Sequence, residues 1–210
     1  MNSLDLFLND DSRVCIYYGG AGKGGTMTGI LKLRKYIEQG KSCAVVMRNG
    51  KDLAVSGGII ECAMKEFSGV TLLSKRLMVF DNKATITFLT VDELDNTKFD
   101  CMFIDNVNQI DETFNIDYLK SCCDVLWTSS NSTKTRGFVF ETLKPHLNKK
   151  DNFYIPNGTV IKIGEVTFIH GTCEDNKNLL QDVPDYKKHL LSLPRDSRNS
   201  LLNGYFVEKN

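Results

Sequence analysis

The sequence predicts an α/β fold with a mainly parallel central sheet, helices on both faces, a β-hairpin and a short helical C-terminal segment. The first observation is a βαβ unit: an apolar run at 14–18, a glycine-rich loop, apolar residues at helical spacing over 30–37, and a second apolar run at 42–47. The second is that further apolar strand-like runs alternate with helical patterns along the chain. Such alternation is typical of parallel sheets covered on both faces.

Each later element is predicted from a local pattern. Apolar residues at helical spacing predict helices, and β-branched and aromatic runs predict strands. In order, these elements are a helix at 59–67, hairpin strands at 76–80 and 84–90, a strand at 100–105, a helix at 116–123, a strand at 124–128 and a helix at 138–147. Asn157-Gly158 predicts a turn between strands at 153–155 and 160–163. Residues 185–203 predict two short helices separated at Pro194.

Composition and charge exclude several classes of protein. The 210 residues carry 26 Lys+Arg against 26 Asp+Glu, which argues against a polybasic DNA-coating protein but not against DNA contact through a local patch. No apolar run is long enough to span a bilayer, and the N-terminus lacks the pattern of a secretion signal, so neither a membrane location nor secretion is expected. Seven cysteines without a CxxC pair and three dispersed histidines predict a reducing cytoplasm and argue against zinc.

The glycine-rich loop after the first strand is the strongest chemical signal. Its frame, Gly19-x-x-x-x-Gly24-x-Thr26, matches a phosphate-binding P-loop in length and in its terminal hydroxyl. Glycines let the backbone curl so that successive N–H groups point at phosphate oxygens, and the following helix adds its N-terminal dipole. The residues predicted to bind nucleotide are Gly19, Gly20, Ala21, Gly22, Lys23, Gly24, Gly25, Thr26 and Met27.

The loop departs from the P-loop pattern at one position. Gly25 stands where the phosphate-binding lysine is expected, and Lys23 lies two residues earlier. Because lysine is a point charge on a flexible stem, we expect Lys23 to reach the β- and γ-phosphates from inside the loop. The alternative is a glycine-rich turn that binds no nucleotide.

A buried strand that ends in an acid supplies the second half of the predicted site. Asp105 follows the apolar run 101–104, and its carboxylate and the Thr26 hydroxyl are the predicted Mg²⁺ ligands. Asn106 comes next; its amide can orient a water molecule but cannot take its proton. Asp111 and Glu112 are further acids nearby in the sequence.

Small polar residues and an arginine are expected at the carboxyl edge of the sheet, where ligands bind in open parallel sheets. Arg48 ends the strand at 42–47, and its guanidinium is expected to stabilise phosphate charge, or else to be a solvated strand end. The small residues predicted to sense the γ-phosphate, with a simple turn as the alternative, are Thr128, Ser129, Ser130 and Asn131.

A run of basic residues lies within twenty positions that contain a single acid, Glu38. Its members are Lys32, Arg34, Lys35, Lys41, Arg48 and Lys51. If these side chains share a face they can track a DNA backbone. A solvated helix face is the other interpretation.

These motifs together resemble the ATPase domain of the large terminase subunit of tailed bacteriophages, a DNA-packaging motor. The resemblance rests on the loop at 18–26, the strand ending at Arg48, the acidic strand with residues 104–110, and the Thr/Ser-rich stretch before Ser132. The closing segment, 172–206, is also similar to the segment that joins the family's ATPase to its nuclease. Gly25 and Asn106 make the Walker A and Walker B motifs deviant.

The resemblance implies a P-loop core of the additional-strand type over 1–180 and a C-terminal helical linker segment over 181–210, with the family's nuclease domain absent. It implies ATP and Mg²⁺ as cofactors. The implied catalytic residues are Asp105, Asn106, Lys23 and Arg48, and residues 128–131 would couple phosphate state to motion.

The resemblance also implies the partners and the place of action. The partners are double-stranded DNA, the portal protein, the small terminase subunit and a separate nuclease domain or polypeptide. The chain itself would form a homo-oligomeric ring, a pentamer on the procapsid, or a monomer in solution. The location would be the cytoplasm of the infected bacterial host.

Two other functions remain open from the sequence. One is a degenerate relative that keeps the fold as a nucleotide-binding or scaffolding protein with little or no ATPase activity. The other is an unrelated P-loop kinase or GTPase, which is disfavoured because the chain has neither an NKxD-like guanine motif nor an obvious acceptor-substrate lid.

Overall fold

The computed structural model describes residues 2–54, 58–74, 76–95, 97–107, 116–131, 138–147 and 155–206. Its strands are β1 (Val14–Gly19), β2 (Ser42–Met47), β3 (Val70–Leu73), β4 (Leu77–Phe80), β5 (Thr85–Thr90), β6 (Phe99–Ile104), β7 (Cys123–Asn131), β8 (Val160–Ile163) and β9 (Val166–Gly171). Its α-helices are α1 (Ser3–Asn9), α2 (Gly25–Lys32), α3 (Arg34–Glu38), α4 (Gly50–Ala54), α5 (Ile59–Glu66), α6 (Ile116–Cys122), α7 (Phe138–Leu143), α8 (Lys177–Asp182), α9 (Tyr186–Ser192) and α10 (Arg195–Leu201). Short 3-10 turns are η1 (Val91–Glu93), η3 (Lys144–His146) and η5 (Cys173–Asp175).

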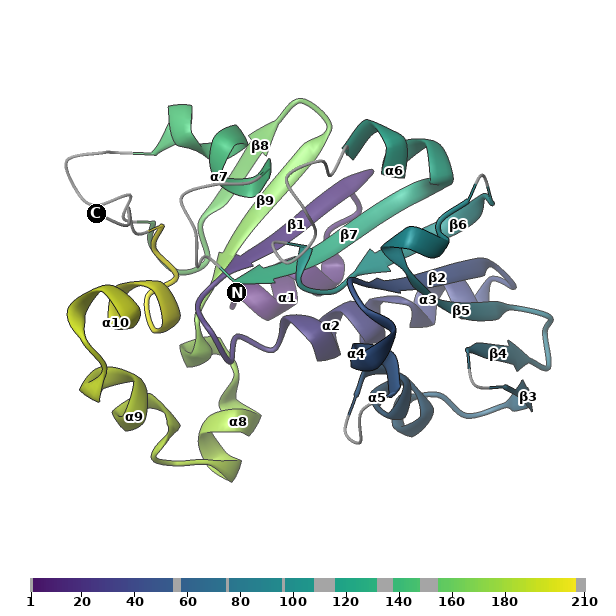
Figure 1. Cartoon of the computed structure of the whole chain (residues 1–210), viewed down its shortest axis with the longest axis horizontal. Helices are drawn as coiled ribbons and strands as arrows, with labels where there is room; N and C mark the ends of the chain where they lie inside the picture. Colours follow the sequence, from purple (N-terminus) through teal and green to yellow (C-terminus); the bar gives the residue numbers. More distant parts are fainter. Residues whose placement is uncertain are drawn as a thin grey trace.

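The described strands form one nine-stranded sheet in the order β3-β4-β5-β2-β6-β7-β1-β9-β8 (Figure 1). The strands from β5 to β9 in this order run parallel to one another. At the edges, β3, β4 and β8 pair antiparallel. Because β7 lies between β1 and β6, an additional strand separates the strand before the glycine loop from the strand that ends at Asp105. The expected α/β fold of the additional-strand type is confirmed.

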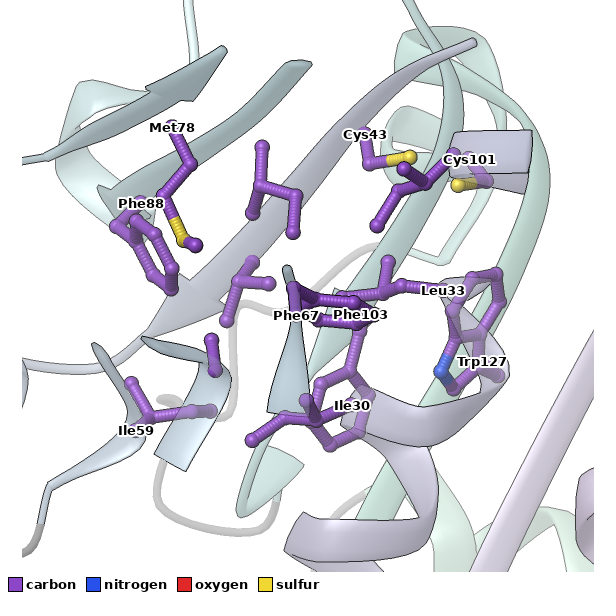
Figure 2. Close-up of a cluster of buried hydrophobic side chains, with 14 of the residues drawn as sticks. Ile30, Leu33, Cys43, Ile59, Phe67, Met78, Phe88, Cys101, Phe103 and Trp127 are labelled. Carbon is purple, nitrogen blue, oxygen red and sulfur yellow. The ribbon is translucent and has the colours of Figure 1, made fainter. Parts of the chain in front are cut away.

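Helices cover both faces of the sheet, and strand side chains alternate between two hydrophobic cores. The core under α1, α2, α3 and α5 buries Ile30, Phe103 and Trp127, as Figure 2 shows. The core under α6 and α7 buries Leu119 and Phe140. Since both faces are covered, the central strands are nearly continuous apolar runs, which is why sequence patterns identified them.

The predicted hairpin and C-terminal helices are present. The segments predicted at 76–80 and 84–90 form β4 and β5, which pair antiparallel. The two helices predicted within 185–203 are α9 and α10, and Pro194 separates them. Proline has no N–H for a helix interior, so it marks this boundary reliably.

β8 pairs with a strand that was not predicted. The predicted turn at Asn157-Gly158 forms, and residue 155 is outside any strand; residues 153–154 of the predicted partner lie outside the described part of the chain. β8 pairs antiparallel with β9, the strand that follows it. Because β9 also pairs in parallel with β1, its residues are buried in the sheet.

β7 is longer than the strand predicted at 124–128. Its polar end stays in the sheet because it pairs with β1, in the register Tyr17↔Ser129 and Gly19↔Asn131. β1 pairs with the backbone of residues 129–131, for which the local sequence pattern alone indicates a turn.

Three of the described helices, α1, α4 and α8, were not predicted. α1 and α8 each follow an asparagine whose side chain caps the helix: Asn2 accepts from the Asp5 N–H, and Asn176 accepts from the Leu179 N–H. Capping by asparagine is a strong start signal, but α1 and α8 are too short for a clear apolar period. Among the described helices, none combines the length and the apolar content that crossing a bilayer requires.

Gly29 provides a test of how closely α2 packs on the sheet. A Cβ at this position would lie 2.2 Å from Cζ of the Phe103 ring, and Trp127 Nε1 donates a hydrogen bond to the Gly29 carbonyl at 2.9 Å. We expect Gly29→Ala to lower the free energy of unfolding by about 1–3 kcal/mol, because the core is overpacked. Urea denaturation measures this change.

Gly50→Ala is the matched control, since the added methyl group would meet only the movable Arg76 guanidinium at 3.3 Å and a Thr90 methyl group at 3.9 Å. Its free energy of unfolding should stay within about 0.5 kcal/mol of the parent value. Equal effects of the two substitutions would contradict the packing argument.

Candidate functional site

The glycine loop curls tightly between β1 and α2. Gly22 and Gly24 have positive φ angles, +71° and +83°, in the left-handed region that other residues rarely adopt. Gly24 is also the residue that precedes α2, so the free N–H groups at the start of this helix face the loop. The backbone thus has the curl and the helix terminus that an anion site needs.

The Lys23 side chain turns inward, toward the carboxyl edge of the sheet. It is 4% exposed, and its Nζ donates a hydrogen bond to Asn131 Oδ1 at 2.9 Å. Burial lowers the pKa of Lys23 to about 8, while the nearby Asp105 carboxylate acts in the opposite direction. A lysine inside the loop therefore presents its ammonium group on the side of the acidic strand.

The space around Gly25 is narrow. A Cβ on Gly25 would lie 2.9 Å from Cβ of Ser129, closer than Cβ atoms approach, and 3.3 Å from Cδ1 of Tyr17, a tight contact. The same point is 3.5 Å from Cε of Lys23, an ordinary van der Waals distance. A side chain at position 25 would therefore require Ser129 to move, and it would pack against the stem of Lys23.

Hydroxyl groups surround the Asp105 carboxylate at the end of β6. Thr26 Oγ1 lies 3.0 Å from both carboxylate oxygens, and Ser129 Oγ also donates to this carboxylate. Burial raises the pKa of Asp105 above its usual value, while the hydrogen bonds from Ser129 and Thr26 and the charge of Lys23 lower it. The sequence-predicted metal pair, Thr26 and Asp105, is thus in direct contact.

This donor set fits a magnesium ion. Mg²⁺ prefers oxygen ligands, typically one or two carboxylates together with hydroxyl and phosphate oxygens. Asp105 is 4% exposed, and a buried carboxylate whose pKa is raised by burial gains stability from a nearby cation. Asn106, with a φ of +54°, donates from Nδ2 to Asp105 Oδ2 at 3.4 Å.

The four polar residues at the end of β7 divide between the two faces of the sheet. Ser129 and Asn131 contact Asp105 and Lys23. Thr128 and Ser130 alternate with them and point to the opposite face, where their buried hydroxyls have no hydrogen-bond partner in the described part of the chain. The structure therefore brings half of this predicted set to the loop.

Several predicted residues lie away from this cluster. Arg48 is exposed after β2 and makes no hydrogen bond to the cluster among the described residues. Asp111, Glu112, Ser132 and the stretch 108–110 lie outside the described residues.

The basic run does not form one free face. Lys32 is 2% exposed and donates to the carbonyls of Phe7 and Asp10. The other paired members are Lys35 with Asp11, Lys41 with Asp100, and Arg34 with Glu66. These contacts favour a structural role for four of the six residues over contact with DNA.

The C-terminal segment forms the outer wall of the loop, which the sequence did not indicate. Ala21 N donates to the Leu201 carbonyl at 2.7 Å, and Asn176 Nδ2 donates to the Gly22 carbonyl at 2.9 Å. A Cβ on Gly22 would collide with the Tyr186 ring at 2.6 Å. In Figure 1 the helices α8 to α10 lie beside the loop between β1 and α2. In the sequence, the glycine content of the loop was the local signal that another segment packs closely against it.

Comparisons with known proteins identify the fold. No protein-family model and no curated protein matches the sequence. Among solved structures, the chain is similar to the large terminase of a thermophilic bacteriophage in complex with ATP-gamma-S, with a TM-score of 0.70 and 14% identity over 98% of this chain and 52% of that one. It is also similar to the large terminase ATPase domain of Thermus phage P74-26, with a TM-score of 0.65 and 11% identity over 99% of this chain and 94% of that one.

A third similar structure is the bacteriophage Phi-29 viral genome packaging motor assembly, with a TM-score of 0.58 and 15% identity over 98% of this chain and 69% of that one. The chain spans about half the length of the large terminase from the thermophilic bacteriophage. At these identities the similarity establishes a shared fold.

The buried hydroxyl of Thr128 makes a testable prediction about stability. We expect Thr128→Val to raise the free energy of unfolding by about 1 kcal/mol, because an apolar group of the same shape replaces a buried hydroxyl without a partner in the described part of the chain. Thr167→Val is the control, since the buried Thr167 hydroxyl pairs with Ser12 Oγ at 2.6 Å. That variant should lose stability in the same urea titration. A loss in both variants would contradict the assignment.

Proposed function

We propose that this chain is the ATP-hydrolysing motor domain of a phage DNA-packaging machine. The observation that carries the proposal is the juxtaposition of Lys23 and Asp105, two buried opposite charges, at the mouth of a curled glycine loop. A structural neighbour that was studied in complex with ATP-gamma-S supports ATP as the ligand. The shared fold with a viral genome packaging motor supports the role in packaging.

The loop would bind the triphosphate through its backbone N–H groups and the ammonium of Lys23. Phosphoryl transfer has a loose transition state with charge on the equatorial oxygens, so positioning and electrostatic stabilisation account for most of the catalysis. Lys23, whose ammonium lies within electrostatic reach of Asp105, would neutralise part of that charge. Thr26 and Asp105 would hold Mg²⁺, and the ion would supply positive charge against the phosphates.

Asn106 would orient the attacking water without taking its proton. Its side chain lies beside Asp105, and an amide has no basic site at neutral pH. Absence of a general base typically lowers the rate by about 10²–10⁴. A guanidinium from a neighbouring subunit would offset part of this loss in a homo-oligomeric ring, and Arg48, exposed after β2, would serve either its own site or a neighbour's.

Asn131 would report the phosphate state to the sheet. It holds the Lys23 ammonium in the structure, so phosphate that draws the ammonium group away removes this hydrogen bond. Ser129 would couple to the same event through Asp105. Force would pass to double-stranded DNA in a ring docked on the portal protein. The small terminase subunit and a nuclease, on the same or another polypeptide, would act with it in the cytoplasm of the infected bacterium.

The second candidate is a nucleotide-binding relative without turnover, and the amide at position 106 is the observation that favours it. Asn106→Glu separates the two candidates. A gain in ATP turnover supports the enzyme, because the new carboxylate accepts the proton of the water. Unchanged, negligible turnover in both forms supports the binding protein.

Steady-state ATPase assays test the catalytic assignment. We expect Lys23→Ala and Asp105→Ala each to lower kcat by about 10²–10³, since each removes a charge that stabilises the transition state. Lys35→Ala is the control, because Lys35 pairs with Asp11 away from the loop. Identical rates in the wild type and both site variants would overturn the assignment.

The pH dependence of ATP affinity tests the charge of Lys23. The pKa of this buried lysine is lowered to about 8, so the ammonium is charged at pH 7 and is largely neutral at pH 9. We expect the dissociation constant of magnesium–ATP to rise about tenfold over this range, as measured by calorimetry. In Lys23→Met the affinity should be weak and nearly independent of pH. A wild-type affinity that does not change would show that Lys23 does not bind the phosphates.

A further inference from the structure

Tyr17 lies directly under the glycine loop. It is fully buried near the end of β1, and its ring stacks on Phe7 of α1 with centroids 4.8 Å apart. The Nζ atom of Lys23 lies 5.6 Å from the centroid of the Tyr17 ring. This distance allows a cation–π interaction, which gains strength where water is excluded.

The Tyr17 hydroxyl contacts the backbone of the same lysine. It donates to the Lys23 carbonyl at 3.2 Å and lies 2.8 Å from Ser3 Oγ. Ser3 donates its own proton to Asp175, which follows β9. The single Tyr17 proton is therefore shared between the Lys23 carbonyl and Ser3. The chain of contacts ties the loop to α1 and to the end of β9.

Two glycines make room for this side chain. A Cβ on Gly171 would lie 2.1 Å from the Tyr17 oxygen, and a Cβ on Gly25 would lie 3.3 Å from its ring. Position 171 must lack a side chain for Tyr17 to keep this place, and a side chain at position 25 would press on the edge of the ring. The Tyr17 side chain thus fits closely between the loop and the end of β9.

We propose that Tyr17 is a positioning residue for Lys23: its ring supports the ammonium group and its hydroxyl holds the Lys23 backbone, so that a lysine inside the loop points at the phosphate site. This inference rests on the proposed function for its consequence, nucleotide affinity, but the placement of the ammonium is independent of nucleotide. Tyr17 itself touches no substrate in this scheme and acts through Lys23.

A double-mutant cycle tests the proposal. The variants are Tyr17→Phe, Lys23→Met and the double variant, and the measurement is the dissociation constant of magnesium–ATP by calorimetry. Tyr17→Phe keeps the packing and removes the hydrogen bond, so we expect affinity to fall by about three- to tenfold. In the Lys23→Met background the same change should cost clearly less, because the part of the loss that acts through the ammonium is then absent, while the contact with the main-chain carbonyl of residue 23 remains.

Tyr18→Phe is the matched control. Tyr18 is equally buried and adjacent in the sequence, but its side chain lies in the core on the opposite face, and its hydroxyl has no hydrogen-bond partner in the described part of the chain. Its ATP affinity should equal that of the wild type. Equal losses from Tyr17→Phe in both Lys23 backgrounds, or no loss, would overturn the proposal.

A nucleotide-free measurement separates this inference from the proposed function. The ε-methylene protons of Lys23, assigned by their loss in Lys23→Met, should show an aromatic ring-current shift in the NMR spectrum. Tyr17→Phe should keep this shift and Tyr17→Leu should remove it, with melting temperatures confirming that both variants fold. If the shift behaves in this way but wild type does not bind ATP, the proposed function fails and the positioning role remains. A shift unaffected by Tyr17→Leu overturns the positioning role, whatever the affinity for ATP.

Discussion

The burial of one ammonium group beside one carboxylate is the constraint on which the site depends. Lys23 and Asp105 are both almost fully buried. Burial lowers the pKa of Lys23 and raises the pKa of Asp105, so it favours the neutral form of each group. Taking charges out of water costs free energy that imperfect pairing does not recover. Buried groups with shifted pKa values of this kind cluster at functional sites in proteins. The loop, the acidic strand and β7 are arranged around this pair.

The same site is closed by both ends of the described chain. Ser3 of α1 and Asn176 before α8 contact Tyr17 and the Gly22 carbonyl, respectively. A small hydrophobic cluster that includes Cys173, Leu190 and Leu202 holds the C-terminal helices together near the loop. A displacement of the loop therefore reaches α8 to α10 through direct contacts. In this architecture the C-terminal segment is part of the wall of the site.

Some features of the molecule have a cost in stability. The hydroxyls of Tyr18, Thr128 and Ser130 are buried on the face of the sheet opposite α2 and lack partners among the described residues. An unpaired buried hydroxyl costs about 1–3 kcal/mol. Residues that reduce stability without a structural gain are commonly kept for function. Thr128 and Ser130 alternate along β7 with Ser129 and Asn131, which contact Asp105 and Lys23. The loss of stability from these unpaired hydroxyls therefore falls at the carboxyl edge of the sheet.

Local patterns predicted the parallel strands other than β9, the helix after the loop and the hairpin, and they grouped Thr26 with Asp105 as metal ligands, because apolar period and motif spacing can be read along the chain. They did not determine where Lys23 points, which strand pairs with β8, or which faces the residues of β7 occupy relative to the loop. Those depend on Tyr17, Ser129 and β9, which are distant in the sequence and meet only after the sheet forms. The sequence alone predicted a phosphate-binding loop with a displaced lysine. Only the tertiary structure decided that the Lys23 ammonium donates to Asn131 and lies within electrostatic reach of Asp105, because β6 and β7 meet the loop only after the sheet forms.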